Sequence, residues 1–131
     1  MKMREQKEVS LIKNVLNKCK YSLQGLGYCF KNESSFTLVT IAACLVILLG
    51  VLFDIEFIQW VLSFGSLALI MIIELLNTSI EAVVDMFTDE YHPLAKIAKD
   101  CGSAAAGLMS ILAAIVNLII FVPYIIKFII K

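Results

Sequence analysis

Three long apolar stretches, separated by short polar segments, account for most of the chain after residue 35. Residues 36–53 carry no charge, residues 57–87 carry acids only in their second half, and residues 101–126 are again apolar. Each stretch is at least as long as a membrane-spanning helix, which needs roughly 17–25 predominantly apolar residues. We therefore expect an all-α integral membrane protein with three transmembrane helices.

The preceding residues 8–31 have a different pattern, in which apolar side chains recur at helical spacing among basic ones. The apolar positions are Ile12, Leu16, Cys19, Leu23, Leu26 and Phe30. Lys13 and Lys20 lie largely away from this stripe. A basic amphipathic helix next to membrane spans lies in the plane of the membrane interface. The sequence thus predicts an interfacial helix followed by three spans, all within one domain of residues 1–131.

The composition agrees with a membrane protein, and the placement of the charges predicts its orientation. Hydrophobic residues make up 60% of the 131 residues, against about 45–50% in soluble domains. The net charge is zero, but seven of the eleven Lys and Arg residues lie in the first 31 residues, and Lys96 and Lys99 follow the second span. The positive-inside rule places the N-terminus and the loop near Lys96 in the cytoplasm, with residues 54–56 and the C-terminus outside. No nucleic-acid partner is expected.

Polar residues form one face of the second predicted span. Glu74, Asn77, Glu81 and Asp85 are separated by three, four and four residues, which places them on one side of a helix. A carboxylate near membrane depth is costly unless it is paired, hydrated or bound to a metal, so a functional role is the default interpretation. The alternative is structural, in which the face joins neighbouring helices by hydrogen bonds.

The predicted topology brings many polar residues to one side of the membrane. They are Glu33, Glu81, Asp85, Asp89, Glu90, His92, Lys96, Lys99 and Asp100. Carboxylates bind Mg²⁺ beside substrate phosphates, and lysines bind phosphate groups. Asp100 could cap the third span, and the N-terminus of that helix could then bind a phosphate group. This set suits phosphoryl transfer, although no Walker A or protein-kinase motif occurs. Two simpler roles stay open: Glu33 as a first-turn acid favoured by the helix dipole, and Lys99–Asp100 as a solvated helix start.

This combination resembles the small bacterial integral-membrane diacylglycerol kinases. The resemblance covers about residues 11–125 and is carried by Glu74-x2-Asn77-x3-Glu81-x3-Asp85, Glu90-Tyr91-His92, Lys99-Asp100 and Gly102-Ser103-Ala104-Ala105. ELLNT at 74–78 and HPLAKIAKD at 92–100 look more like the Gram-positive branch, which includes undecaprenol kinases. The resemblance implies a homotrimer with active sites shared between protomers. It also implies that ATP with Mg²⁺ phosphorylates a lipid alcohol, undecaprenol or diacylglycerol, at the cytoplasmic face of the bacterial cell membrane.

The resemblance also suggests roles for individual residues. Glu74 matches the general base on the lipid hydroxyl, with Asn77 as an active-site amide beside it, and Glu33 and Glu81 match the metal-binding pair. Positions that match nucleotide-binding residues are Tyr21, Glu33, Glu81, Glu90, Tyr91, His92, Lys99 and Asp100. Positions assigned to the lipid substrate are Ser35, Phe36, Thr37, Glu74 and Ser103.

Two departures from the family pattern concern the lipid rather than the chemistry. Enterobacterial members carry an Arg where Thr37 stands and an aromatic residue where Leu23 stands.

Two other functions are compatible with an intramembrane acid. One is a small proton-coupled transporter with Glu74 as its proton site, and the other is a structural subunit in which Glu74 and Asn77 join helices. Neither of these needs the cytoplasmic group of lysines and acids.

Overall fold

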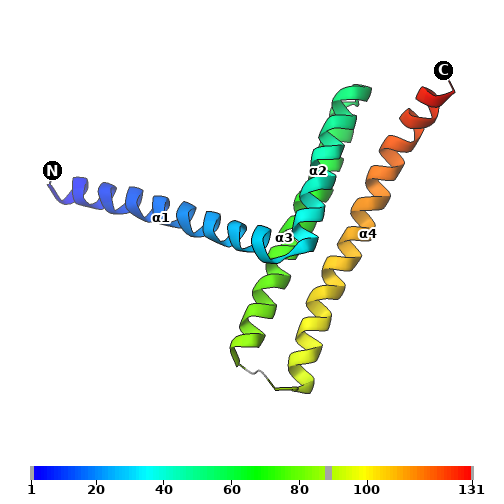
Figure 1. Cartoon of the computed structure of the whole chain (residues 1–131). Coiled ribbons are helices and arrows are strands. Elements are labelled where there is room, and N and C mark those ends of the chain that lie inside the picture. Colours follow the sequence, from blue (N-terminus) through cyan, green and yellow to red (C-terminus); the bar gives the residue numbers. More distant parts are fainter. Residues whose placement is uncertain (1, 88–89, 131) are drawn as a thin grey trace.

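The computed structural model describes residues 2–87 and 90–130, with side chains from residue 11 onward, as four α-helices. They are α1 (Lys2–Asn32), α2 (Ser34–Phe53), α3 (Phe57–Phe87) and α4 (Pro93–Ile129). In Figure 1, α2, α3 and α4 run side by side as a bundle, whereas α1 extends to one side and meets the bundle partway along its length. The second half of α3 and the first turns of α4 therefore project beyond the level of α1.

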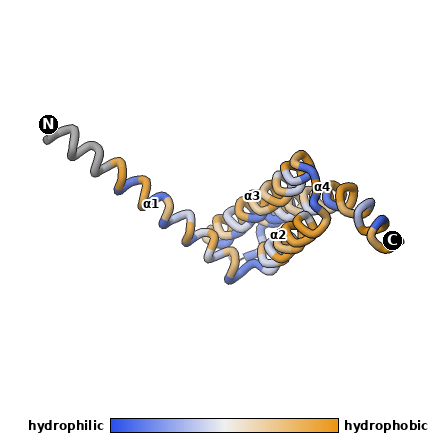
Figure 2. Tube along the Cα trace, turned by 90° about the horizontal axis from the view of Figure 1, so that it is seen from above, coloured by the Kyte–Doolittle hydropathy of each residue, from blue (hydrophilic) through white to orange (hydrophobic). Residues whose placement is uncertain are grey.

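The surface of the bundle is apolar. α2, α3 and α4 are each long and apolar enough to cross a membrane. Large apolar side chains point outward along these helices, among them Leu48 and Ile119, which are 64% and 70% exposed. Figure 2 shows that hydrophobic residues predominate along α2, α3 and α4, whereas hydrophilic and hydrophobic residues alternate along the coloured part of α1. Soluble monomers rarely expose continuous apolar surface of this extent, so the fold is that of a membrane protein with three candidate spans.

Both ends of α2 are set by single residues with non-helical backbone. Glu33 separates α1 from α2 with an extended backbone, φ −111° and ψ 111°, so the chain changes direction there. Asp54 has φ 50° and ψ 55°, and its N–H donates to the Gly50 carbonyl. An Asp tolerates this left-handed conformation better than most residues do. The segment 54–56, between the first two predicted spans, therefore forms a tight turn between α2 and α3.

The fourth helix begins earlier than the sequence suggested. The expected span of residues 101–126 is the central part of α4, which starts at Pro93. His92 is the N-cap, and its Nδ1 accepts a hydrogen bond from the Leu94 N–H at 3.2 Å. The prediction that Asp100 caps this helix is wrong, because Asp100 lies two turns inside it. Pro93 accounts for the difference, since proline at the first helical position is pre-organised for a helix and lacks the N–H that would be unpaired there.

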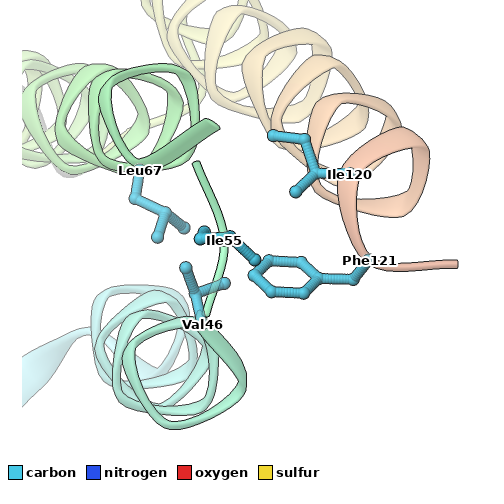
Figure 3. Packing of buried hydrophobic residues seen from close by; sticks show 5 residues of the cluster. All are labelled: Val46, Ile55, Leu67, Ile120 and Phe121. Carbon is cyan, nitrogen blue, oxygen red and sulfur yellow. The ribbon is translucent and has the colours of Figure 1, made fainter. Parts of the chain in front are cut away.

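Two apolar clusters hold the three long helices together. Figure 3 shows the first, in which α2, the α2–α3 turn, α3 and α4 contribute Val46, Ile55, Leu67, Ile120 and Phe121. The second lies nearer the α1–α2 junction and contains Val39, Ile70, Met109 and Ala113. The most extensive pairing is between α3 and α4. These contacts fix the polar face of α3 relative to the start of α2 and the first turns of α4.

Candidate active site

Glu74 meets the start of α2 at the level where α1 joins the bundle. Only 7% of Glu74 is exposed, and the Ser35 hydroxyl donates a hydrogen bond to its Oε2 at 3.1 Å. Phe36, the next residue, is buried and packs edge-on against Phe30 of α1, with ring centroids 4.8 Å apart. This packing fixes the first turn of α2, so the serine is held against the carboxylate. Two residues that the sequence assigned to the site, 39 positions apart, are thus in contact.

Asn77 and Glu81 continue the polar face one and two turns further along α3. The Asn77 Nδ2 donates to Glu81 Oε1 at 2.9 Å. The Asn77 Oδ1 is buried and has no hydrogen-bond partner among the described residues. It lies against the backbone of α4, since a Cβ placed on Gly102 would stand 2.3 Å from it. The close approach of α4 at Gly102 therefore holds the amide, and the amide orients the Glu81 carboxylate.

A pocket of about 400 Å³ lies at the α3–α4 connection, beyond the level of α1. Its lining residues are Val84, Asp85, Glu90, Tyr91, His92, Ala95, Lys96, Lys99 and Asp100. Five of them are positions that the sequence assigned to the nucleotide. Among the described residues, Lys99 forms an ion pair with Asp85 and Lys96 forms one with Asp100, and all four side chains line the pocket. Asp89, which the sequence placed in the same group, lies outside the described residues.

Other predicted site residues do not reach this pocket within one chain. Tyr21 is 64% exposed on α1, which extends away from the bundle (Figure 1). Glu33 is half-buried and lines a separate groove at the α1–α2 junction together with Thr37. Ser103 follows Gly102 but is exposed. Among the described residues, no three His, Cys, Asp or Glu side chains are grouped so that they could hold a metal ion. The expected pairing of Glu33 with Glu81 at a metal involves only two carboxylates and stays a prediction.

The arrangement separates two chemical tasks along one helix. The Glu74 carboxylate is shielded from solvent and bonded to a hydroxyl, so it can accept a proton from another hydroxyl that replaces Ser35. The pocket offers two ammonium groups near the first turns of α4, whose N-terminal N–H groups favour anions. Glu74 and Asp85 are eleven residues apart in a continuous helix, or about 16 Å at 1.5 Å per residue. Asn77 and Glu81 occupy the space between them.

Comparison with known proteins gives a consistent result for most of this chain. Residues 20–121 match the sequence profile described as prokaryotic diacylglycerol kinase. The chain is 37% identical over 100 residues to the undecaprenol kinase of Bacillus subtilis, covering 76% of this chain and 81% of that protein. It is 41% identical over 97 residues to the diacylglycerol kinase of Escherichia coli K12, covering 74% and 79%, and 40% identical over 103 residues to that of Haemophilus influenzae, covering 79% and 87%. The extent of these matches shows that the chain belongs to the prokaryotic diacylglycerol kinase family, whose members are lipid kinases.

Proposed function

We propose that this membrane lipid kinase transfers the γ-phosphate of ATP to undecaprenol, with diacylglycerol as the alternative acceptor. The observation that carries the proposal is the polar face of α3. It begins at a buried carboxylate bonded to Ser35 and ends at a pocket that contains five expected nucleotide residues. Undecaprenol is placed first because HPLAKIAKD and ELLNT resemble the Gram-positive branch, and because Thr37 and Leu23 depart from the enterobacterial pattern. The products would be undecaprenyl phosphate or phosphatidic acid, with ADP.

The chemistry requires one proton acceptor and a site that positions the phosphates. The lipid hydroxyl takes the place of Ser35 at Glu74, which accepts its proton as the oxygen attacks the γ-phosphorus in line. The bond between the γ-phosphorus and the bridging β-oxygen breaks, and ADP leaves. Lys99 leaves its ion pair with Asp85 to contact the phosphate oxygens. Because both reactants are held, positioning supplies much of the rate.

The residues present suit a magnesium ion that is completed by the nucleotide. Mg²⁺ is usually held by one or two carboxylates together with substrate phosphates and waters, so a cluster of three acids is not required. One carboxylate oxygen of Glu81, Oε1, accepts the hydrogen bond from Asn77. Glu33 is the other carboxylate that the family pattern assigns to the metal. The ion would neutralise charge on the triphosphate during transfer.

We predict that Glu33→Gln and Glu81→Gln each raise the Mg²⁺ concentration required for half-maximal activity. We expect a shift of at least about tenfold, since each variant removes one charged ligand, and a contact to a charged group contributes about 1.5–3 kcal/mol. Activity is measured against Mg²⁺ concentration at fixed ATP, and size-exclusion chromatography checks the oligomer. An unchanged Mg²⁺ midpoint in both variants would refute a metal role.

The membrane position follows from the level of Glu74. The segment from Phe57 to Glu74 is about 26 Å long at 1.5 Å per residue, close to the hydrocarbon thickness of about 30 Å. We propose that α1 is an amphipathic helix in the cytoplasmic interface of the bacterial cell membrane. Glu74 then lies at the boundary of the hydrocarbon, where a lipid hydroxyl resides, and the pocket lies in the cytoplasm beside ATP.

The corresponding topology prediction places the N-terminus inside and the C-terminus outside. Single cysteines are introduced on a Cys-free background, one of them at Asp54, and labelled with a membrane-impermeant maleimide in right-side-out and inverted vesicles. We expect the cysteine at position 54 to react only from the outside, because the α2–α3 turn lies opposite the lysine-rich N-terminus. Labelling of that position only from the cytoplasmic side would contradict the orientation.

We further propose that the enzyme is a homotrimer whose active sites are shared between protomers. Its support is the position of Tyr21 and Glu33, which lie away from the nucleotide pocket of their own chain, together with the apolar outer faces of the bundle. Neighbouring subunits would bring these side chains to the site. The mass of the fully active enzyme in detergent micelles is measured by sedimentation equilibrium. A mass equal to that of one subunit would rule out the trimer.

The function is tested by one assay with labelled ATP and two lipids. The purified full-length chain in mixed micelles is given undecaprenol and diacylglycerol side by side, and the labelled lipid products are separated. Labelled undecaprenyl phosphate formed faster than phosphatidic acid supports the proposal, and the reverse order makes diacylglycerol the substrate. If neither lipid is labelled, the enzyme proposal is wrong. The transporter hypothesis would then be examined by proton-coupled efflux in vesicles.

A further inference from the structure

Lys96 lies in the nucleotide pocket although the family pattern does not assign it there. It is the fourth residue of α4, which begins at Pro93. It lines the same pocket as the expected nucleotide residues Lys99 and Asp100. Lys96 and Lys99 are three positions apart, so they lie on the same side of the helix. The first turn of α4 carries no acidic residue.

The ion pair with Asp100 does not by itself explain this lysine. Both side chains are largely exposed, 59% for Lys96 and 61% for Asp100, and exposed pairs contribute little to stability. The pair also has the less favourable order for an i, i+4 pair, with the lysine on the N-terminal side. The helix dipole disfavours a cation near the start of a helix. A lysine that gains so little from its position can leave Asp100 for a stronger anionic partner at low cost.

The charge in the pocket gives a second, independent argument. Its described lining includes the carboxylates of Asp85, Glu90 and Asp100 and the ammonium groups of Lys96 and Lys99. Without Lys96, the Lys99 ammonium alone would stand beside the Asp85 and Asp100 carboxylates where a triphosphate must bind, and like charges at short range oppose such binding. We propose that Lys96 is a second phosphate-binding lysine, which contacts the nucleotide triphosphate together with Lys99. This inference rests on the proposed ATP site and extends it by one residue.

The test compares three variants of the full-length enzyme in micelles. Lys96→Met removes the charge at similar length, Lys96→Arg keeps it, and Lys127→Met is the matched control, an exposed lysine in the last turn of the same helix. We expect Lys96→Met to raise KM for MgATP about tenfold or more, the size of one charge-assisted contact, with kcat for lipid phosphorylation within a few fold of the parent. Lys96→Arg and Lys127→Met should keep KM near the parental value.

Binding of inorganic tripolyphosphate and AMP, measured by calorimetry, separates phosphate contact from general damage. In Lys96→Met the tripolyphosphate affinity should fall about tenfold, while the AMP affinity should change much less. An unchanged KM for ATP, or equal losses for tripolyphosphate and AMP, would overturn the inference. The calorimetric arm needs no lipid turnover. A parent that binds tripolyphosphate through Lys96 but phosphorylates no lipid would therefore contradict the proposed function and not this inference.

Discussion

Glu74→Gln is expected to lower turnover by at least about 10²-fold, the lower end of the range for general acid–base catalysis. The glutamine keeps the size of the side chain and can still bond to the Ser35 hydroxyl, but it cannot accept a proton from the lipid. Nucleotide binding and thermal stability should stay near those of the parent, because the pocket lies about 16 Å further along α3. Turnover is measured at saturating ATP and lipid, and stability by thermal unfolding in the same detergent.

Two further variants decide between a base and a structural role for Glu74. Ser35→Ala removes the hydrogen bond at 3.1 Å and leaves the carboxylate, so turnover should fall far less than in Glu74→Gln. Glu56→Gln is the matched control, since Glu56 is an exposed acid immediately before α3, far from the pocket. If Glu74→Gln retains turnover within a few fold, or loses it only by unfolding, the general-base assignment is wrong. Equal losses in Glu74→Gln and Ser35→Ala would indicate that the hydrogen bond, and not proton transfer, is what the carboxylate supplies.

Helical periodicity predicted those parts of the fold that depend on local sequence. The bounds of the second span, residues 57–87, agree with α3, and the first span begins two residues earlier than expected, at Ser34. The i, i+4 spacing of Asn77 and Glu81 placed them on one face, and the hydrogen bond between them confirms it. The start of α4 was missed because residues 88–99 are polar and read as a loop. The proline and histidine that open the helix were the available signal.

Contacts between helices are the part that periodicity cannot supply. Nothing in the local sequence pairs Ser35 with Glu74, which are 39 residues apart, because that contact depends on how α2 packs on α3. Lys96 was recognised as a cytoplasmic lysine, but its place in the pocket follows from the early start of α4. In the proposed trimer, Tyr21 and Glu33 act at the site of a neighbouring subunit, a contact that periodicity within one chain does not describe. Gly102 opens a run of small residues, 102–107, a pattern typical of close helix packing in membranes, and it is where α4 approaches Asn77.

Gly102→Ala is expected to lower turnover by about 10²-fold with little loss of stability. The new Cβ would stand 2.3 Å from the Asn77 Oδ1, which is closer than real Cβ contacts allow. Asn77 is the more movable partner, because its amide lies at the end of a side chain whereas the Cβ is fixed to the helix backbone. The amide would rotate away and lose its 2.9 Å bond to Glu81. A displacement of about 1 Å in a positioned catalytic group can cost about 10²-fold in rate.

Gly107→Ala is the control, five residues further along the same helix. A Cβ at Gly107 meets nothing within 4 Å, and replacing glycine by alanine inside a helix stabilises it by about 1 kcal/mol. Gly107→Ala should therefore keep full turnover and unfold at the same or a higher temperature than the parent. In Gly102→Ala the same gain in helix propensity offsets part of the steric cost, so activity should fall while the unfolding temperature changes little. Normal turnover in Gly102→Ala would show that Asn77 is not held by α4 in the working enzyme. Parallel loss of turnover and folding would show instead that this contact supports the bundle rather than the site.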